Sequence, residues 1–207
     1  DQLAVTGSVD VQTNGATGDA TVVNATALDL NTSAVGGNLD ATATTGDVTD
    51  SGVATVGGTA SFTAANANDD ILVDQLAVTG SVDVQTNGAT GNATVLNATS
   101  LDLDTSAVGG NLVAGATTGD LTDSGVATVG GDAFFTTSAA NAEITVDQLA
   151  VASRVQVNTN GATGNATVVN ATALDILLAS VGGNLDATAT TGNVTDSGVA
   201  TVGGTAS

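Results

Sequence analysis

Aspartate is the only side chain in this sequence that is both plentiful and chemically useful. The 207 residues include 21 carboxylates and a single Lys or Arg, which gives a formal net charge of −20. Asp69, Asp70 and Asp74 lie close together around the apolar segment 71–73. Because clusters of oxygen ligands suit Ca²⁺, these three residues predict a calcium site. Ca²⁺ is the only cofactor that the sequence suggests.

A solvated acidic edge is the competing interpretation of the same residues. The second occurrence of the segment has Ala142 and Glu143 in place of Asp69 and Asp70. The nonapeptide calcium pattern of β-helices, GGxGxDxUx, does not occur in the sequence. Both interpretations predict an acidic surface, but only the first predicts a bound ion.

Paired carboxylates would suit a second chemistry, the cleavage of polysaccharides. Glycosidases need two carboxyl groups about 5–9 Å apart. The equivalent aspartates of the repeat described below, Asp50, Asp123 and Asp196, are expected three rungs and so about 14 Å apart. We therefore expect no enzymatic activity, and we keep a polysaccharide-acting enzyme as an alternative.

The residue types that are missing exclude several other functions. The sequence has no Cys and no His, and its one cation is Arg154, so thiol, imidazole and Schiff-base chemistry and zinc sites have no residues to use. The charge of −20 argues against nucleic acid as a partner. No run of 18 apolar residues occurs, so we expect no membrane insertion.

The chain is a repeat. The segment DQLAV begins at residue 1 and recurs, at equal intervals, at residues 74 and 147. These intervals give units 1–73 and 74–146 and a partial unit 147–207. Because no linker and no shift in composition separates the units, we expect one continuous domain.

A finer period predicts the rungs of a solenoid. Short alternating apolar and polar segments begin at Ser8, Asn38, Thr59 and Ser81, so the first interval is longer than the next two. This alternation is typical of half-buried strands, and Gly, Asn, Asp and Ser separate the segments as turn residues do. Each unit would then hold three rungs, and each rung about three short strands.

The sequence therefore predicts an all-β fold, a parallel β-helix (β-solenoid) of roughly 8–9 rungs spaced about 4.8 Å apart. A narrow core suits the abundant Val, Ala and Leu, and the absence of Pro keeps every N–H available to neighbouring rungs. The residues leave open a disordered low-complexity chain, a β-sandwich and a cross-β stack.

Several further patterns allow two interpretations each. Thr42 with Thr44 and Thr188 with Thr190 suggest an ice-binding row, which the second unit breaks at Gly115. Five NAT sequons predict either glycosylation or turns with stacked amides; their asparagines are Asn24, Asn92, Asn97, Asn165 and Asn170. Residues 177–178 are Leu-Leu where the first unit has Asn-Thr. These leucines predict a lateral contact if they face outward, and core variation if they face inward.

The segment VGGNLDATATTGDVTDSGVATVGGTASFTAANANDDILV, residues 35–73, resembles the repeats of filamentous haemagglutinin-like adhesins and related autotransporter-type surface proteins of bacteria. The same order of motifs covers residues 28–73 and 101–146, and part of it covers 174–207. The resemblance implies a right-handed coil, secretion to the cell surface and a shaft role in adhesion, biofilm or intercellular filaments. It leaves the export route open.

The expected function is structural: the shaft of a secreted bacterial adhesin or extracellular filament protein. The chain starts and stops within a repeat, so we expect either continuation in a longer polypeptide or end-to-end or lateral contacts between copies. A host or neighbouring cell surface is a further expected partner. The alternative is a binding module whose regular face meets Ca²⁺, glycan or ice.

Overall fold

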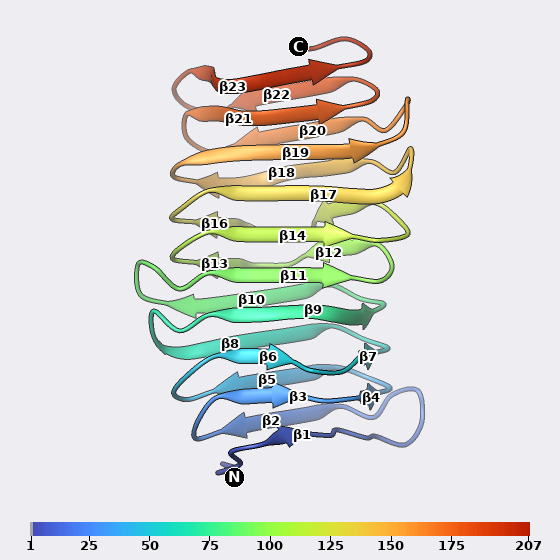
Figure 1. Cartoon of the computed structure of the whole chain (residues 1–207), viewed down its shortest axis with the longest axis vertical. Helices are drawn as coiled ribbons and strands as arrows, with labels where there is room; N and C mark the ends of the chain where they lie inside the picture. The colour runs from blue at the N-terminus through green and yellow to red at the C-terminus, as the bar shows by residue number, and fades with distance from the viewer. Residues whose placement is uncertain (1) are drawn as a thin grey trace.

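The computed structural model describes residues 2–207 as a right-handed parallel β-solenoid (Figure 1). In Figure 1 the strands nearer the viewer run to the right and those behind run to the left, while the chain climbs from the N-terminus to the C-terminus. All pairings between strands are parallel, and the strands form two sheets. We call them the front sheet and the back sheet.

The front sheet has 12 strands. They are β1 (Ser8–Val9), β3 (Leu28–Leu30), β4 (Ser33–Val35), β6 (Val48–Asp50), β7 (Ala54–Val56), β9 (Ile71–Val78), β11 (Ala93–Asn97), β14 (Leu112–Ala116), β17 (Ala133–Ala140), β19 (Arg154–Asn160), β21 (Leu174–Val181) and β23 (Val194–Val202).

The back sheet has 11 strands. They are β2 (Ala20–Asn24), β5 (Leu39–Ala43), β8 (Ala60–Ala67), β10 (Val82–Asn87), β12 (Leu101–Leu103), β13 (Ser106–Val108), β15 (Leu121–Asp123), β16 (Ala127–Val129), β18 (Ile144–Val151), β20 (Ala166–Asn170) and β22 (Leu185–Ala189).

The predicted solenoid is confirmed, with about nine turns from β2 to β23. A turn has three strands where one face is broken in two, as in β3 with β4, β6 with β7, β12 with β13 and β15 with β16. The other turns have one long strand on each face. The prediction of about three strands per turn therefore holds for the broken turns only.

The length of one turn follows from the strand register. Six successive pairings lead from Leu28 to Val155, so one turn advances the chain by (155 − 28)/6, or about 21 positions. A sequence unit such as 1–73 therefore spans three and a half turns, which corrects the predicted three. The long interval from Ser8 to Asn38, predicted as one rung, is about one and a half turns that end on the opposite sheet.

The half turn places equivalent segments of consecutive units on opposite sheets. The LDL segment lies on the front sheet as β3, and its equivalent in the second unit lies on the back sheet as β12. In the third unit the segment returns to the front sheet at the start of β21. Asp50 and Asp123 accordingly lie on different sheets.

The core is a single narrow column between the two sheets, filled by inward side chains. Phe62 and Phe135 are its largest members and are fully buried. Phe62 lies in register between Ala41 on the preceding turn and Val84 on the next. A small residue on one neighbouring turn thus gives each ring its room, which is why an alanine-rich and valine-rich sequence can hold two phenylalanines.

Glycine is required where successive turns cross closely at the corners. A Cβ atom on Gly36 would lie 1.8 Å from the carbonyl oxygen of Gly15, and one on Gly109 would lie 1.8 Å from that of Gly88. Gly15 and Gly88 themselves have φ near +90°, a conformation that L side chains rarely adopt. The VGG and NGAT motifs therefore meet on neighbouring turns. Within the described residues no helix is long and apolar enough to cross a membrane.

Candidate functional site

The three aspartates of the predicted calcium site have separate surroundings. Asp69 follows β8, and its carboxylate accepts hydrogen bonds from the backbone N–H of Gly46 and from Nδ2 of Asn66, the latter at 2.9 Å. The Asp69 carboxylate therefore ties one corner of the solenoid to the preceding turn.

Asp70 bonds to the next turn, whereas Asp69 bonds to the preceding turn. Its Oδ1 accepts the backbone N–H of Asn92 on the next turn at 2.7 Å. Asp74 lies within β9 and is exposed. Among residues 2–207 no group of three or more carboxylates is placed to hold a metal ion. Calcium binding at Asp69, Asp70 and Asp74 stays a prediction, and the structure gives the first two a structural role.

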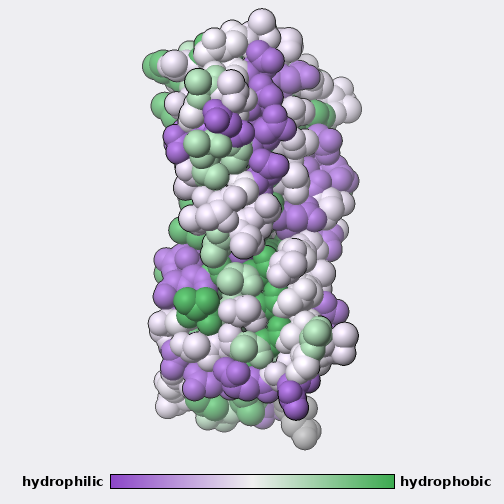
Figure 2. Space-filling view, turned by 90° about the vertical axis from the view of Figure 1, so that its right-hand side faces the viewer, coloured by the Kyte–Doolittle hydropathy of each residue, from purple (hydrophilic) through white to green (hydrophobic). Residues whose placement is uncertain are grey.

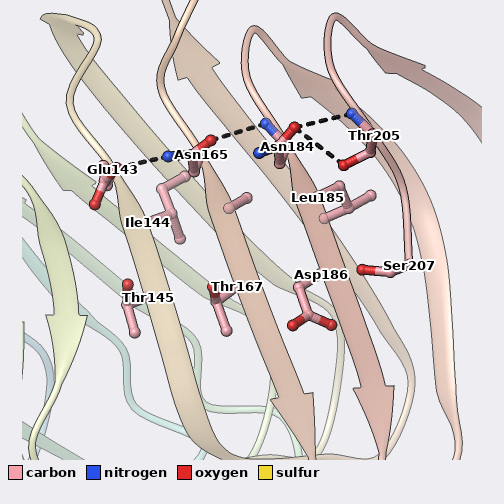
Figure 3. Close-up of a pocket in the computed structure, with 11 residues that line it drawn as sticks. Glu143, Ile144, Thr145, Asn165, Thr167, Asn184, Leu185, Asp186, Thr205 and Ser207 are labelled. Carbon is pink, nitrogen blue, oxygen red and sulfur yellow. Dashed lines mark hydrogen bonds between the residues drawn. The ribbon is translucent and has the colours of Figure 1, made fainter.

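Acidic and amide side chains form ladders along the corners that precede the strands. Figure 3 shows one such ladder on the back sheet. Asn165 donates to Glu143 at 2.7 Å, and its Oδ1 accepts the backbone N–H of Asn184 at 2.9 Å. Asn184 repeats the pattern with the backbone N–H of Thr205 at 2.9 Å. Each side chain thus satisfies an N–H group one turn further along the rod.

The same corner ladder recurs on both edges of the solenoid. Its other members include Asp19, which accepts from Asn38; Asn38, which accepts from Thr59; Asp47, which accepts from Asp70; Asn92, which accepts from Asn111; Asn111, which accepts from Asp132; and Asp120, which accepts from Glu143. Each of these bonds gives a backbone N–H group at an exposed corner a side-chain acceptor on the preceding turn. Much of the Asp and Asn content is therefore part of the fold's own hydrogen bonding.

Two buried carboxylates each cap two backbone N–H groups of the next turn. Asp50 is 7% exposed, and its two oxygens accept the N–H groups of residues 74 and 75 at 2.9 and 2.8 Å. Asp123 is 8% exposed and does the same for residues 147 and 148. Both receiving segments lie at a shift in strand register. The carboxylates therefore stabilise a bulge, which would otherwise leave N–H groups unpaired.

Burial dominates the acidity of these two groups. It raises the pKa of Asp50 and of Asp123 above the ordinary value, and the hydrogen bonds from the backbone offset only part of the rise. Burial likewise raises the pKa of Asp83. These carboxyls take up protons more readily in the folded chain than in the unfolded chain.

Three of the five sequon asparagines are closed to modification in the folded chain. Asn24, Asn97 and Asn170 are 0% exposed. The Oδ1 of Asn97 accepts the N–H of Val78 at 2.8 Å, and its Nδ2 donates to the carbonyl oxygen of the same residue at 2.9 Å. The side-chain amide thus pairs like a backbone amide with the turn below, which agrees with the predicted turn role.

The other two sequons are accessible to different extents. Asn92 is exposed and Asn165 is half-buried, and both belong to the corner ladders. Glycosylation at these two positions stays a prediction.

Arg154 forms the one ion pair among the described residues. Its Nη2 lies 2.7 Å from Oδ2 of Asp132 on the neighbouring turn, and the bond from Arg154 lowers the pKa of Asp132. The equivalent positions in the first unit are Ser8 and Thr59. Both members of the ion pair therefore differ from the residues at the equivalent repeat positions. The presence of Asp132 explains why a single Arg occurs on an acidic rod.

The predicted threonine row is not continuous. Thr42 lies on β5 and Thr188 on β22, both on the back sheet, while Gly115 lies on β14 of the front sheet. Leu178 is 37% exposed on β21. The Leu-Leu segment of the third unit thus presents apolar surface, as the outward interpretation required.

Sequence reasoning missed the capping role of Asp50 and Asp123. The signal was present as a fixed offset, since the Asp of TDSG precedes the DQ pair by the same interval in both complete cases. That offset is close to one turn, but it becomes informative only when the length of a turn is known.

The model of one protein family matches the chain. Its description is repeats of unknown function (DUF5649), and it matches residues 17–85, 90–160 and 163–207. The comparison with curated proteins gave no match, and the comparison with solved structures gave none.

Proposed function

We propose, for a chain that belongs to the family of repeats of unknown function (DUF5649), that it forms a shaft segment of a secreted bacterial adhesin or extracellular filament protein. The observation that supports this proposal most directly is the unbroken stack of about nine turns. At about 4.8 Å per turn the stack is about 43 Å long. Its work would be to space and present contacts at the cell surface.

The use of the polar groups supports a mechanical role. Carboxylates and amides are the side chains that the sequence suggested for catalysis or metal binding. At Asp50, at Asp123 and along the corner ladders they accept hydrogen bonds from backbone N–H groups of neighbouring turns. These bonds run along the rod and add to the strand ladders. A shaft needs such continuity, because each turn contacts only its neighbours.

The uniformly acidic character of the chain also fits a spacer. Spread over the repeats, the charge of −20 keeps a long rod soluble and opposes clumping of copies. The haemagglutinin-like adhesin repeats, which the VGGNL and TDSG motifs resemble, are the model for this assignment and for the location outside the cell.

The test changes the number of units in the protein as its organism makes it. Deletion of residues 74–146 should shorten the shaft by one unit and partly reduce adhesion or cell aggregation. Duplication of the unit should keep or increase adhesion and aggregation. Antibody binding to intact cells would report surface display. Complete loss of adhesion in the deletion, at unchanged display, would show that the unit is a binding module.

A melt with and without calcium tests the metal-free form of this proposal. A shaft held by backbone and side-chain bonds should melt at nearly the same temperature with about 1 mM Ca²⁺ or with a chelator. A large rise in the midpoint with Ca²⁺ that Asp69→Asn and Asp70→Asn abolish would instead establish the calcium site.

A further inference from the structure

The bulges of β9 and β18 each carry a small pocket beside them on the outer surface. The first lies where front-sheet strands end, near the middle of the rod. Figure 2 looks onto that edge, where apolar surface lies recessed between polar residues. We call it the first bulge pocket, and its lining includes Val53, Asp74, Gln75, Leu96, Ala98 and Thr117.

A second pocket repeats the first one sequence unit further along the chain. We call it the second bulge pocket, and its corresponding residues are Val126, Asp147, Gln148, Val169, Ala171 and Thr190. Only the pair Leu96 and Val169 differs in residue type. An outward position nearby does change between the same two units, since Val113 is replaced by Asp186.

The apolar wall of each pocket has no role in the core. Val53 is 49% exposed and Val126 is 47% exposed. Both precede a short strand, β7 and β16, whose own inward residues are buried. Apolar surface kept in the same place twice, next to a polar rim, is the composition of a small binding site.

The bulge turns the charged rim outward. The backbone N–H of Asp74 points to the buried Asp50, and the side chain of Asp74 stays exposed. Asp147 stands in the same relation to Asp123. Each pocket therefore combines an accessible carboxylate, a glutamine amide and a threonine hydroxyl with aliphatic walls.

The charges determine what such a pocket attracts. The chain carries 21 carboxylates, and its one cation is engaged by Asp132. A second copy of the chain and any anionic ligand would be repelled, whereas a cation would be drawn in. A lysine side chain fits both halves of the pocket, because its aliphatic stem covers apolar surface while its ammonium group meets a carboxylate.

We propose that the two bulge pockets are duplicate docking sites for lysine side chains of a basic polypeptide. The half turn in each unit places them on opposite sheets, about 17 Å apart along the rod for three and a half turns. One chain would thus bind two basic partners, one on each face. This inference does not depend on the shaft role, since a spacer and an independent binding module could both use it.

Pentalysine is the probe for the first measurement. In an NMR titration at low salt, the amide signals of residues 53, 75 and 117 and of their equivalents 126, 148 and 190 should shift together. Binding should saturate at two peptides per chain. Pentaornithine, with one methylene fewer in each side chain, should bind more weakly at the same charge, and fully acetylated pentalysine should leave the signals unmoved. Equal binding of pentaornithine would overturn the role of the apolar wall.

Charge-matched variants decide whether the pockets or the net charge bind the peptide. The double variant Asp74→Asn with Asp147→Asn should weaken binding about fivefold, the range of an exposed ion pair. The control Asp40→Asn with Asp186→Asn removes the same charge from exposed positions outside the pockets and should change affinity little. Equal weakening in both pairs would overturn the proposal in favour of general attraction.

Variants of the wall test the pocket without touching charge. Val53→Thr with Val126→Thr keeps the shape of exposed side chains, and the NMR spectrum reports that the fold is intact. Weaker pentalysine binding would support the proposal. Unchanged peptide binding, with or without altered self-association in sedimentation, would overturn it, and altered self-association would assign the pockets to contacts between copies.

Discussion

At the scale of single residues, the main result is that buried amide and carboxylate side chains make hydrogen bonds that the backbone of a neighbouring strand would otherwise make. Asn97 shows this most clearly, because it pairs with both the N–H and the C=O of Val78 while fully buried. Its equivalents Asn24 and Asn170 make the same bonds to Val5 and Val151. A residue that reads as a modification site in the sequence is a structural bracket in the fold.

Asn97→Ala should therefore lower the free energy of unfolding by roughly 3 kcal/mol, because two backbone groups of Val78 lose their partner in a buried place. Urea denaturation followed by circular dichroism measures the change. Asn92→Ala is the matched control in the same unit, since Asn92 is exposed and its loss should cost about 1 kcal/mol or less. Equal losses in the two variants would refute the bracket role.

The raised pKa values of Asp50, Asp83 and Asp123 predict a rod that gains stability as the pH falls. Burial is the largest cause of each rise. A carboxyl whose pKa is higher in the folded chain binds more protons there, so stability decreases as the pH rises through that folded pKa. As the pH falls through the raised pKa values of the folded chain toward the ordinary value of 3.8, the melting temperature should increase, and the lower self-repulsion of the rod acts in the same direction.

Asp123→Asn should reduce the slope of melting temperature against pH as the pH falls toward the ordinary pKa of aspartate, because the variant lacks one of the carboxyls whose pKa is raised in the folded chain. Asp132→Asn is the control, since Arg154 lowers the pKa of Asp132. The stability that the ionised Asp132 contributes is therefore lost only at a pH below the ordinary pKa of aspartate. A slope unaffected by Asp123→Asn would show that the buried carboxyl does not titrate there.

At the scale of the elements, strand breaks and corners are set by close approach between turns. Gly109 is one case, because a Cβ there would lie 1.8 Å from the carbonyl oxygen of Gly88. In the third unit a strand break of the first unit is absent. Where Asn31 and Thr32 separate β3 from β4, residues 177–178 are Leu-Leu and β21 runs unbroken.

Gly109→Ala should destabilise the solenoid by roughly 3 kcal/mol or more, because neither backbone can move away without breaking ladder bonds. Gly7→Ala is the control, since nothing lies within 4 Å of the added Cβ, and it should change stability by less than about 0.5 kcal/mol. Thermal melts of the two variants measure the difference. A tolerated Gly109→Ala would mean that the corner is looser than described.

At the scale of the whole molecule, the half turn gives the rod equivalent faces. Because each sequence unit makes three and a half turns, each feature of one unit reappears on the other sheet in the next unit, as β3 and β12 do. Features that any unit presents are thus offered to both sides of the rod. This property suits a spacer that is approached from any direction, and it places the two bulge pockets on opposite faces.

Deletion of residues 74–146 should leave a folded rod shorter by about 17 Å, the height of three and a half turns. The junction of Val73 with Asp147 reproduces the native order of residues, and the joined strand would stack on β7 as β9 does now, because β9 and β18 differ at one position. Small-angle scattering measures the length and circular dichroism the strand content. Loss of the strand signal would show that the units are not interchangeable.

The sequence by itself determined the class of fold and the period. Alternating Val, Ala and Leu with Gly and Asn at the turns specify short stacked strands, because strand periodicity and turn chemistry are local properties. The tertiary structure alone decided the length of a turn, since a corner such as that of Gly36 and Gly15 forms between residues far apart in the sequence. For the same reason the partners of Asp50 and Asn97, the separation of Asp69, Asp70 and Asp74, and the opposite placement of equivalent residues followed only once the turns were in register.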